Sequence, residues 1–190
     1  MNESDILKIL ADSEALLSGH FELRSGLHSD RYFQCANLLR YPRLAERLCT
    51  ELAARLRAAV PGIDFDGVIS PALGGILVGH EMGRAFDKKH IFAEKADGQL
   101  VLRRFTIKPG ERYLVAEDVV TKGGRVQETI DIVKAAGGIP AAVTVLVDRS
   151  GGAAHFECPF VSLLQMTPTT WEPADCPLCK QGGHSVHPGS

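Results

Sequence analysis

From Phe65 onward, short runs of β-branched and other apolar residues alternate with amphipathic segments and with turns that contain glycine. The apolar runs cover residues 67–70, 112–116 and 142–147, and helical periodicity covers residues 76–85 and 126–136. Such alternation is typical of strands that run parallel and are joined by helices. The sequence therefore predicts an α/β fold with a central, mostly parallel sheet flanked by helices.

One pair of apolar runs has a different connection. Residues 90–93 and 99–102 flank the dipeptide Asp97-Gly98, which favours a tight turn between antiparallel strands. This pattern predicts a β-hairpin arm. The arm is basic, since it carries three cations: Lys95, Arg103 and Arg104.

The N-terminal third differs from the rest of the chain. A helix is expected to start at Ser4 or Asp5, whose side chains can cap free amides, and to be broken by Gly19. Residues 21–33 indicate a strand, a turn at Ser25-Gly26 and a second strand, with enough polar residues to line a site. Leucines at one-face spacing predict a further helix from Pro42 to the Pro-Gly pair at 61–62.

Length and composition limit the possible functions. At 190 residues the chain suits one domain, residues 1–190, in which residues 1–40 form an N-terminal segment and residues 171–190 a loop-like tail. A net charge of -2 favours a small-molecule ligand over nucleic acid, and no apolar run is long enough to span a membrane. Because the first residues are acidic and unlike a signal peptide, we expect a cytoplasmic protein.

The five cysteines predict reduced thiols, because their number is odd and they are scattered: Cys35, Cys49, Cys158, Cys176 and Cys179. Cys176 and Cys179 have the spacing of a zinc-binding pair, but a zinc site needs about four ligands. Nearby candidates form no second matching pair: His155, Cys158, His184 and His187. The sequence favours a turn with two free thiols, and no side chain is expected to bind a metal.

Residues 113–125 contain the strongest chemical pattern. Four residues of a strand lead into Glu117-Asp118, and residues 121–124 then form a loop that opens onto a helix. Amides at a helix N-terminus bind phosphate, and glycines let the backbone approach it. Adjacent carboxylates are poor phosphate ligands but accept hydrogen bonds from hydroxyls or face a cation. A phosphate beside a vicinal diol, as in a ribose phosphate, matches both halves of the pattern.

This segment resembles the phosphoribosyl diphosphate motif of type I phosphoribosyltransferases. The resemblance implies that Glu117 and Asp118 hold the ribose 2- and 3-hydroxyls. It also implies that the following residues bind the phosphorylated sugar: Val119, Val120, Thr121, Lys122, Gly123, Gly124 and Arg125.

Three further segments are similar to the orotate phosphoribosyltransferase family, namely residues 19–33, 70–75 and 147–152. The resemblance implies the fold of that family, with a small N-terminal hood over the sheet. Arg24, Thr121 and Arg149 are then expected to bind orotate, and Lys95 also to contact the phosphoribosyl diphosphate. The residues implied in catalysis are Lys95, Arg103, Glu117 and Asp118, although the alignment does not decide between Arg103 and Arg104.

The resemblance further implies the reaction and its partners. The expected enzyme transfers 5-phosphoribosyl from phosphoribosyl diphosphate to N1 of orotate, giving orotidine 5-monophosphate and diphosphate in de novo pyrimidine (UMP) biosynthesis. It would use Mg²⁺ bound mainly through phosphoribosyl diphosphate, and it would form a homodimer that exchanges the basic arm between active sites. Lys122 and Arg125 depart from the usual small or hydroxylated residues of the motif, and Gly74 replaces a lysine found in some relatives.

Two other interpretations remain open. A phosphoribosyltransferase for purine bases would have the same sugar site, but two arginines near the base suit an anion such as orotate better. A regulator that senses phosphoribosyl diphosphate without turnover would need an output module, and the segment before the first site residues is too short for a helix-turn-helix domain.

Overall fold

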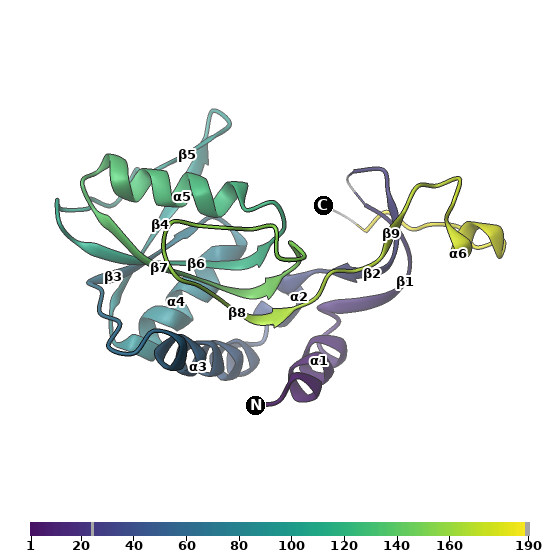
Figure 1. Cartoon of the computed structure of the whole chain (residues 1–190), viewed down its shortest axis with the longest axis horizontal. Helices are drawn as coiled ribbons and strands as arrows, with labels where there is room; N and C mark the ends of the chain where they lie inside the picture. Colours follow the sequence, from purple (N-terminus) through teal and green to yellow (C-terminus); the bar gives the residue numbers. More distant parts are fainter. Residues whose placement is uncertain (24, 189–190) are drawn as a thin grey trace.

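The computed structural model describes residues 1–23 and 25–188, and their large sheet has the expected α/β architecture (Figure 1). Six strands lie in the order β5-β4-β3-β6-β7-β8, and all neighbouring pairs are parallel except β4 with β5. Their bounds are β3 Gly67–Pro71, β4 Lys89–Ala96, β5 Gln99–Val101, β6 Arg112–Val120, β7 Ile139–Asp148 and β8 Phe160–Gln165. The parallel pairs bring the carboxyl ends of β3, β6 and β7 to one edge.

Helices cover both faces of this sheet (Figure 1). On one face lie α3 (Pro42–Ala59) and α4 (Gly74–Phe86), and on the other lies α5 (Gly124–Ala135). The leucines of α3 fall on one side because their spacing matches the helical period, and Leu48, Leu52 and Leu56 are fully buried. No helix within residues 1–23 and 25–188 combines the length and apolar character needed to cross a membrane.

A smaller antiparallel sheet stands to one side of the large one (Figure 1). It contains β1 (Leu16–Glu22), β2 (His28–Phe33) and β9 (Thr170–Trp171), in the order β1-β2-β9. We call β1, β2 and the turn between them the hood hairpin. The predicted strand-turn-strand of residues 21–33 is therefore present, with a first strand that starts earlier than expected.

The first helix is shorter than the sequence suggested. Helix α1 (Glu3–Asp12) ends well before Gly19, and its N-cap is Asn2, whose side chain accepts from the Asp5 amide at 2.8 Å. The helix ends where the Ser13 hydroxyl donates to the carbonyl of Ile9 at 2.8 Å. The leucines at 16 and 17 belong to β1 instead, because they pair with β2.

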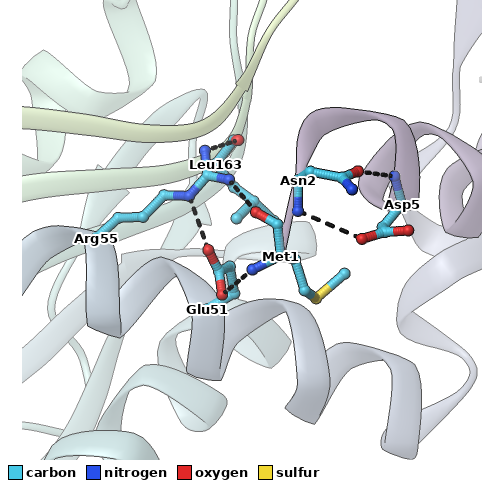
Figure 2. Close-up of polar contacts among 6 residues, drawn as sticks. All are labelled: Met1, Asn2, Asp5, Glu51, Arg55 and Leu163. Carbon is cyan, nitrogen blue, oxygen red and sulfur yellow. Dashed lines mark hydrogen bonds and ion pairs between the residues drawn. The ribbon is translucent and has the colours of Figure 1, made fainter.

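Contacts at the N-terminus connect α1 to the body of the molecule (Figure 2). The Met1 amine donates to Glu51 of α3 at 2.8 Å, and Arg55 of α3 pairs with the same carboxylate at 3.2 Å. Arg55 also donates to the carbonyl of Leu163 in β8 at 2.7 Å. These bonds fix α1, α3 and β8 against one another beneath the hood hairpin.

The C-terminal tail contains short elements of secondary structure and pairs with the hood hairpin. Besides β9 it contains the short helix α6 (Pro177–Lys180), and Val186 forms a parallel bridge to Phe21 of β1. The Val186 amide donates to the carbonyl of His20 at 2.8 Å, and the Glu22 amide donates to the carbonyl of Val186 at 2.9 Å. Most of the described tail has no regular secondary structure, as expected, but these backbone bonds connect it to a distant strand, which local periodicity does not reveal.

The remaining elements agree with the sequence or add to it. Asp97 and Gly98 have φ values of 49° and 86°, as a tight turn with two left-handed residues requires, and β4 and β5 form the predicted hairpin arm. A short helix, α2 (Cys35–Leu39), joins the hood hairpin to α3 and was not predicted.

Candidate active site

Strand β6 carries the two adjacent carboxylates. The sequence suggested that the strand stops at Glu117, but it continues to Val120 because β7 pairs with it along this stretch, up to Val120 with Asp148. The carboxylates are therefore held within a rigid strand rather than in a loop. Glu117 is buried, with 7% of its surface exposed, and Asp118 is half-buried.

Glycines at the start of α4 lie directly against these carboxylates. A Cβ atom on Gly75 would lie 2.9 Å from Glu117 Oε1, and one on Gly74 would overlap Asp118 Oδ2. A lysine at position 74 would therefore collide with Asp118 in this structure. The missing Cβ atoms let the N-terminus of α4, with its partial positive charge, approach two negative groups.

The two carboxylates influence each other's charge. The Asp118 amide donates to Glu117 Oε1 at 3.0 Å, and the Val119 amide donates to Asp118 Oδ1 at 2.8 Å. Burial, and then the negative charge of Asp118, raise the pKa of Glu117 well above its usual range. A ligand that donates hydrogen bonds or brings a cation would stabilise the ionised pair.

The loop after β6 forms a small hollow at the start of α5. Gly123 is the N-cap of α5, and its φ of 81° is a left-handed conformation that favours glycine. The hollow has a volume of about 70 Å³ and is lined by Val119, Val120, Thr121, Gly123, Gly124, Arg125 and Val126. The first free amides of a helix and a hydroxyl group thus surround a space suited to an anion.

A larger cavity of about 560 Å³ lies beside this hollow. It is lined by Leu23, Ser25, Tyr32, Phe33, Gln34, Thr121, Lys122 and Arg149. Thr121 lines both spaces, so the hollow and the cavity meet at its side chain. The structure thus brings the hood hairpin, the loop after β6 and the end of β7 around one site.

Arg149 follows β7 and has an unusual environment. Its amide donates to the carbonyl of Val120 at 2.8 Å, and its guanidinium carbon lies 5.5 Å from the centre of the Phe33 ring. Its Nε is buried and has no hydrogen-bond partner within the described residues. Burial lowers the pKa of Arg149. An anion in the cavity would satisfy this guanidinium.

The two cations that depart from the motif are placed differently. Lys122 is exposed and lines the larger cavity. Arg125 lies in the first turn of α5 and pairs with Glu128 at 3.1 Å, so part of its charge is already balanced. Both remain beside the hollow that the sequence assigns to a phosphate.

The other predicted site residues are not brought to these cavities. Arg24 lies outside the described residues. Lys95 is exposed on β4 and lines neither space. Arg104 pairs with Glu94 at 3.1 Å, whereas Arg103 is exposed and has no ion-pair partner in the described part of the chain. Gln34 lines the larger cavity but was missed, because a glutamine after a strand carries no distinctive sequence pattern.

Solved structures with this architecture define the class. The orotate phosphoribosyltransferase from Aeropyrum pernix matches 85% of the chain and 93% of its own, with a TM-score of 0.69 and 25% identity. The adenine phosphoribosyltransferase from Thermoanaerobacter pseudethanolicus matches 72% of the chain and 88% of its own, with a TM-score of 0.61 and 16% identity. The fold is that of the phosphoribosyltransferases, and at this level it is compatible with more than one base.

Sequence comparison is more specific. No family model matches the chain. The orotate phosphoribosyltransferase of Heliobacterium modesticaldum is 52% identical over 191 residues, which cover 100% of the chain and 99% of that protein. The chain belongs to the orotate phosphoribosyltransferase family.

Proposed function

We propose that the chain transfers the 5-phosphoribosyl group from phosphoribosyl diphosphate to N1 of orotate, releasing diphosphate and giving orotidine 5-monophosphate. This is the step expected of its family in the synthesis of UMP. The observation that carries the proposal is the half-buried Arg149, whose buried Nε has no partner among the described residues, in a cavity that joins the hollow at the start of α5. A planar anionic base next to a sugar phosphate would fill both spaces.

The base side of the site suits an anion better than a neutral purine. The Arg149 guanidinium would donate to the orotate carboxylate in charge-assisted hydrogen bonds, which offset the partial desolvation of this half-buried cation. Thr121 lies where base and sugar meet and can donate to either. Tyr32 and Phe33 supply apolar walls for the ring. Arg24 remains a proposed orotate ligand on the family resemblance alone.

The sugar side would use the carboxylates of β6. Glu117 and Asp118 accept hydrogen bonds from the ribose 2- and 3-hydroxyls, and the amides of residues 121–125 surround the 5-phosphate. As diphosphate leaves C1, positive charge grows on the ribose ring. The ionised carboxylates then stabilise this charge, and the rigid strand keeps C1 facing N1 of the base.

Magnesium fits the same arrangement. Burial and then repulsion from Asp118 raise the pKa of Glu117, so the two carboxylates form an environment that favours a nearby cation. Mg²⁺ bound through diphosphate and the ribose hydroxyls would neutralise negative charge on the leaving group. Glu117 and Asp118 would orient those hydroxyls.

The basic hairpin arm would complete the site from a second subunit. Lys95 and Arg103 are exposed and line neither cavity of their own chain, as expected if they act in a neighbouring site of a homodimer. There they would contact the departing diphosphate. Arg104 is the weaker candidate because Glu94 already pairs with it. The proposal also includes a location in the cytoplasm, where the five cysteines, none of which is in a disulfide, would stay reduced.

One assay tests the function. Purified chain is incubated with Mg²⁺, phosphoribosyl diphosphate and either orotate, adenine, hypoxanthine or uracil, and base consumption is followed by ultraviolet absorbance. Turnover of orotate and not of the other bases is expected. Turnover of a purine instead would overturn the substrate, and binding of phosphoribosyl diphosphate without turnover of any base would favour a regulator.

A further inference from the structure

Four side chains that the reaction does not use meet between the hood hairpin and the C-terminal tail. His20 lies on β1, His28 on β2, Cys176 at the N-cap of α6 and Cys179 within α6. The nitrogen or sulfur atoms that they offer all lie within 4.8 Å of one another. The candidates near the two cysteines in the sequence lie outside this cluster: His155, His184 and His187, which are exposed, and the half-buried Cys158. The sequence had favoured two free thiols instead.

The backbone explains why the two histidines meet. The pairing of β1 with β2 shifts by one residue between Ser18 and Phe21, so a bulge lies at positions 19–20. Such an extra residue redirects side chains on the bulged strand. His20 and His28 are consequently neighbours, with ring centres 4.8 Å apart. Cys176 and Cys179, three residues apart around one helical turn, approach from the tail.

Four of the six distances among the ligand atoms are close to those of tetrahedral coordination. His20 Nε2 lies 2.8 Å from His28 Nδ1, 3.4 Å from Cys176 Sγ and 3.6 Å from Cys179 Sγ, and Cys179 Sγ lies 3.3 Å from His28 Nδ1. Around zinc, ligand separations are about 3.3 Å for two nitrogens, about 3.6 Å for nitrogen and sulfur and about 3.8 Å for two sulfurs. The nitrogen pair is somewhat closer than this, and these three mixed pairs agree. The other mixed pair and the two sulfurs lie within 4.8 Å.

Hydrogen bonding alone does not account for these contacts. His20 Nε2 has three close neighbours. A histidine ring nitrogen has either one proton to donate or one lone pair to accept, so it cannot make good hydrogen bonds to all three. A single cation at the centre would contact all four atoms at once. Two imidazoles and two thiolates in a tetrahedron are a donor set typical of zinc. Burial also suits a closed structural site, since Cys176 is fully buried and His28 is 7% exposed.

The geometry points to a structural zinc site formed by His20, His28, Cys176 and Cys179. Neither α6 nor the hood hairpin is expected to be stable alone, because α6 has four residues and an isolated hairpin is marginal in water. Zinc therefore joins the tail to the hood hairpin, in support of the backbone bonds of Val186. The same hairpin supplies Leu23, Ser25 and Tyr32 to the larger cavity, so the ion fixes one wall of the proposed base site.

The first experiment measures metal directly. The full chain is produced without a histidine tag, dialysed against buffer without chelator and analysed by mass spectrometry for zinc, cobalt and iron. One zinc per chain is expected. Replacement of zinc by Co²⁺ should give the visible d–d bands of a tetrahedral site and a thiolate-to-cobalt charge-transfer band. A chain that holds no zinc and gives no such bands after reconstitution overturns the site, as does a native Cys176–Cys179 disulfide.

Variants locate the ion. Cys176→Ser and His28→Gln should reduce bound zinc from one equivalent to less than about a tenth, since each removes a ligand whose binding energy is coupled to local folding. Cys158→Ser is the matched control, because Cys158 is half-buried and lies outside the cluster. Equal loss of zinc in the control would overturn the assignment. If a variant fails to fold, the cobalt spectrum of the unmodified chain still decides.

A third readout connects zinc to the hood. Removal of zinc from the unmodified chain should expose residues near the tail to limited proteolysis and raise the KM for orotate more than that for phosphoribosyl diphosphate. The kinetic part rests on the proposed function, whereas metal content and the cobalt spectrum need no substrate. An inactive chain that binds one zinc would therefore contradict the reaction and retain the site, and an active chain without zinc would do the reverse.

Discussion

Replacing Arg149 by methionine should change substrate binding and stability in opposite directions. The substitution keeps an unbranched side chain in the cavity but removes a half-buried charge whose buried Nε has no partner within residues 1–23 and 25–188. Charge-assisted hydrogen bonds contribute about 1.5–3 kcal/mol each, so loss of one to the orotate carboxylate should raise the KM for orotate by about 10- to 150-fold. A buried polar group without a partner costs about 1–3 kcal/mol, so the free energy of unfolding of the ligand-free variant should rise by about 1 kcal/mol.

Steady-state kinetics with varied orotate and urea unfolding without substrate would measure the two effects. Arg43→Met is the control, because Arg43 is exposed on α3 and its loss removes the same charge from the surface. The control should leave both quantities nearly unchanged. An unchanged KM for orotate in Arg149→Met would refute the carboxylate contact. A clear fall in the free energy of unfolding would contradict the expectation that the unpaired Nε of Arg149 destabilises the ligand-free protein.

Three further predictions concern charge. Lys95→Ala should lower kcat by about 10- to 1,000-fold with little change in orotate binding measured by calorimetry, and normal turnover would remove Lys95 from catalysis. Asp118→Asn should move the acid limb of the pH profile of kcat/KM for phosphoribosyl diphosphate to lower pH, because the Asp118 charge adds to burial in raising the pKa of Glu117. An acid limb at the same pH would contradict this coupling. Burial lowers the pKa of His90 to about 4 from the usual 6.5, so the unfolded chain binds more protons between these values and stability falls as pH falls through that window. His90→Gln should flatten that fall in urea unfolding at pH 7 and pH 5, and equal slopes would exclude His90 as its source.

The large sheet could be predicted from the sequence because its information is local. Runs of β-branched residues, glycine turns and one-face leucine spacing gave β3, β4, β6, β7 and their helices, and Asp97-Gly98 gave the hairpin arm. The candidate sugar site could be proposed from the sequence for the same reason, since its carboxylates, loop and helix start are consecutive. The family resemblance and the relatives of similar sequence agree on orotate.

The features that the sequence did not reveal are set by contacts between segments far apart in the chain. The extension of β6 past Glu117 requires the partner strand β7, and the end of α1 at Asp12 reflects pairing of the next residues with β2. The side chains that contact Cys176 and Cys179 lie on the hood hairpin, 156 residues away for Cys176 and His20, so spacing along the chain offered no second ligand pair and favoured two free thiols. The tail was assigned to a loop on the same grounds.

The hood joins the two ends of the chain, and this has a consequence for synthesis on the ribosome. The Ser29 hydroxyl donates to the carbonyl of Thr169 across 140 residues, and His20 contacts Cys176 across 156. At about 5–20 residues per second, the emerging hairpin waits roughly 7 to 30 s for these partners. The sheet from β3 to β8 can assemble during that time, whereas the hairpin remains an unpaired edge available to chaperones. This wall of the proposed base site is therefore expected to mature after the large sheet.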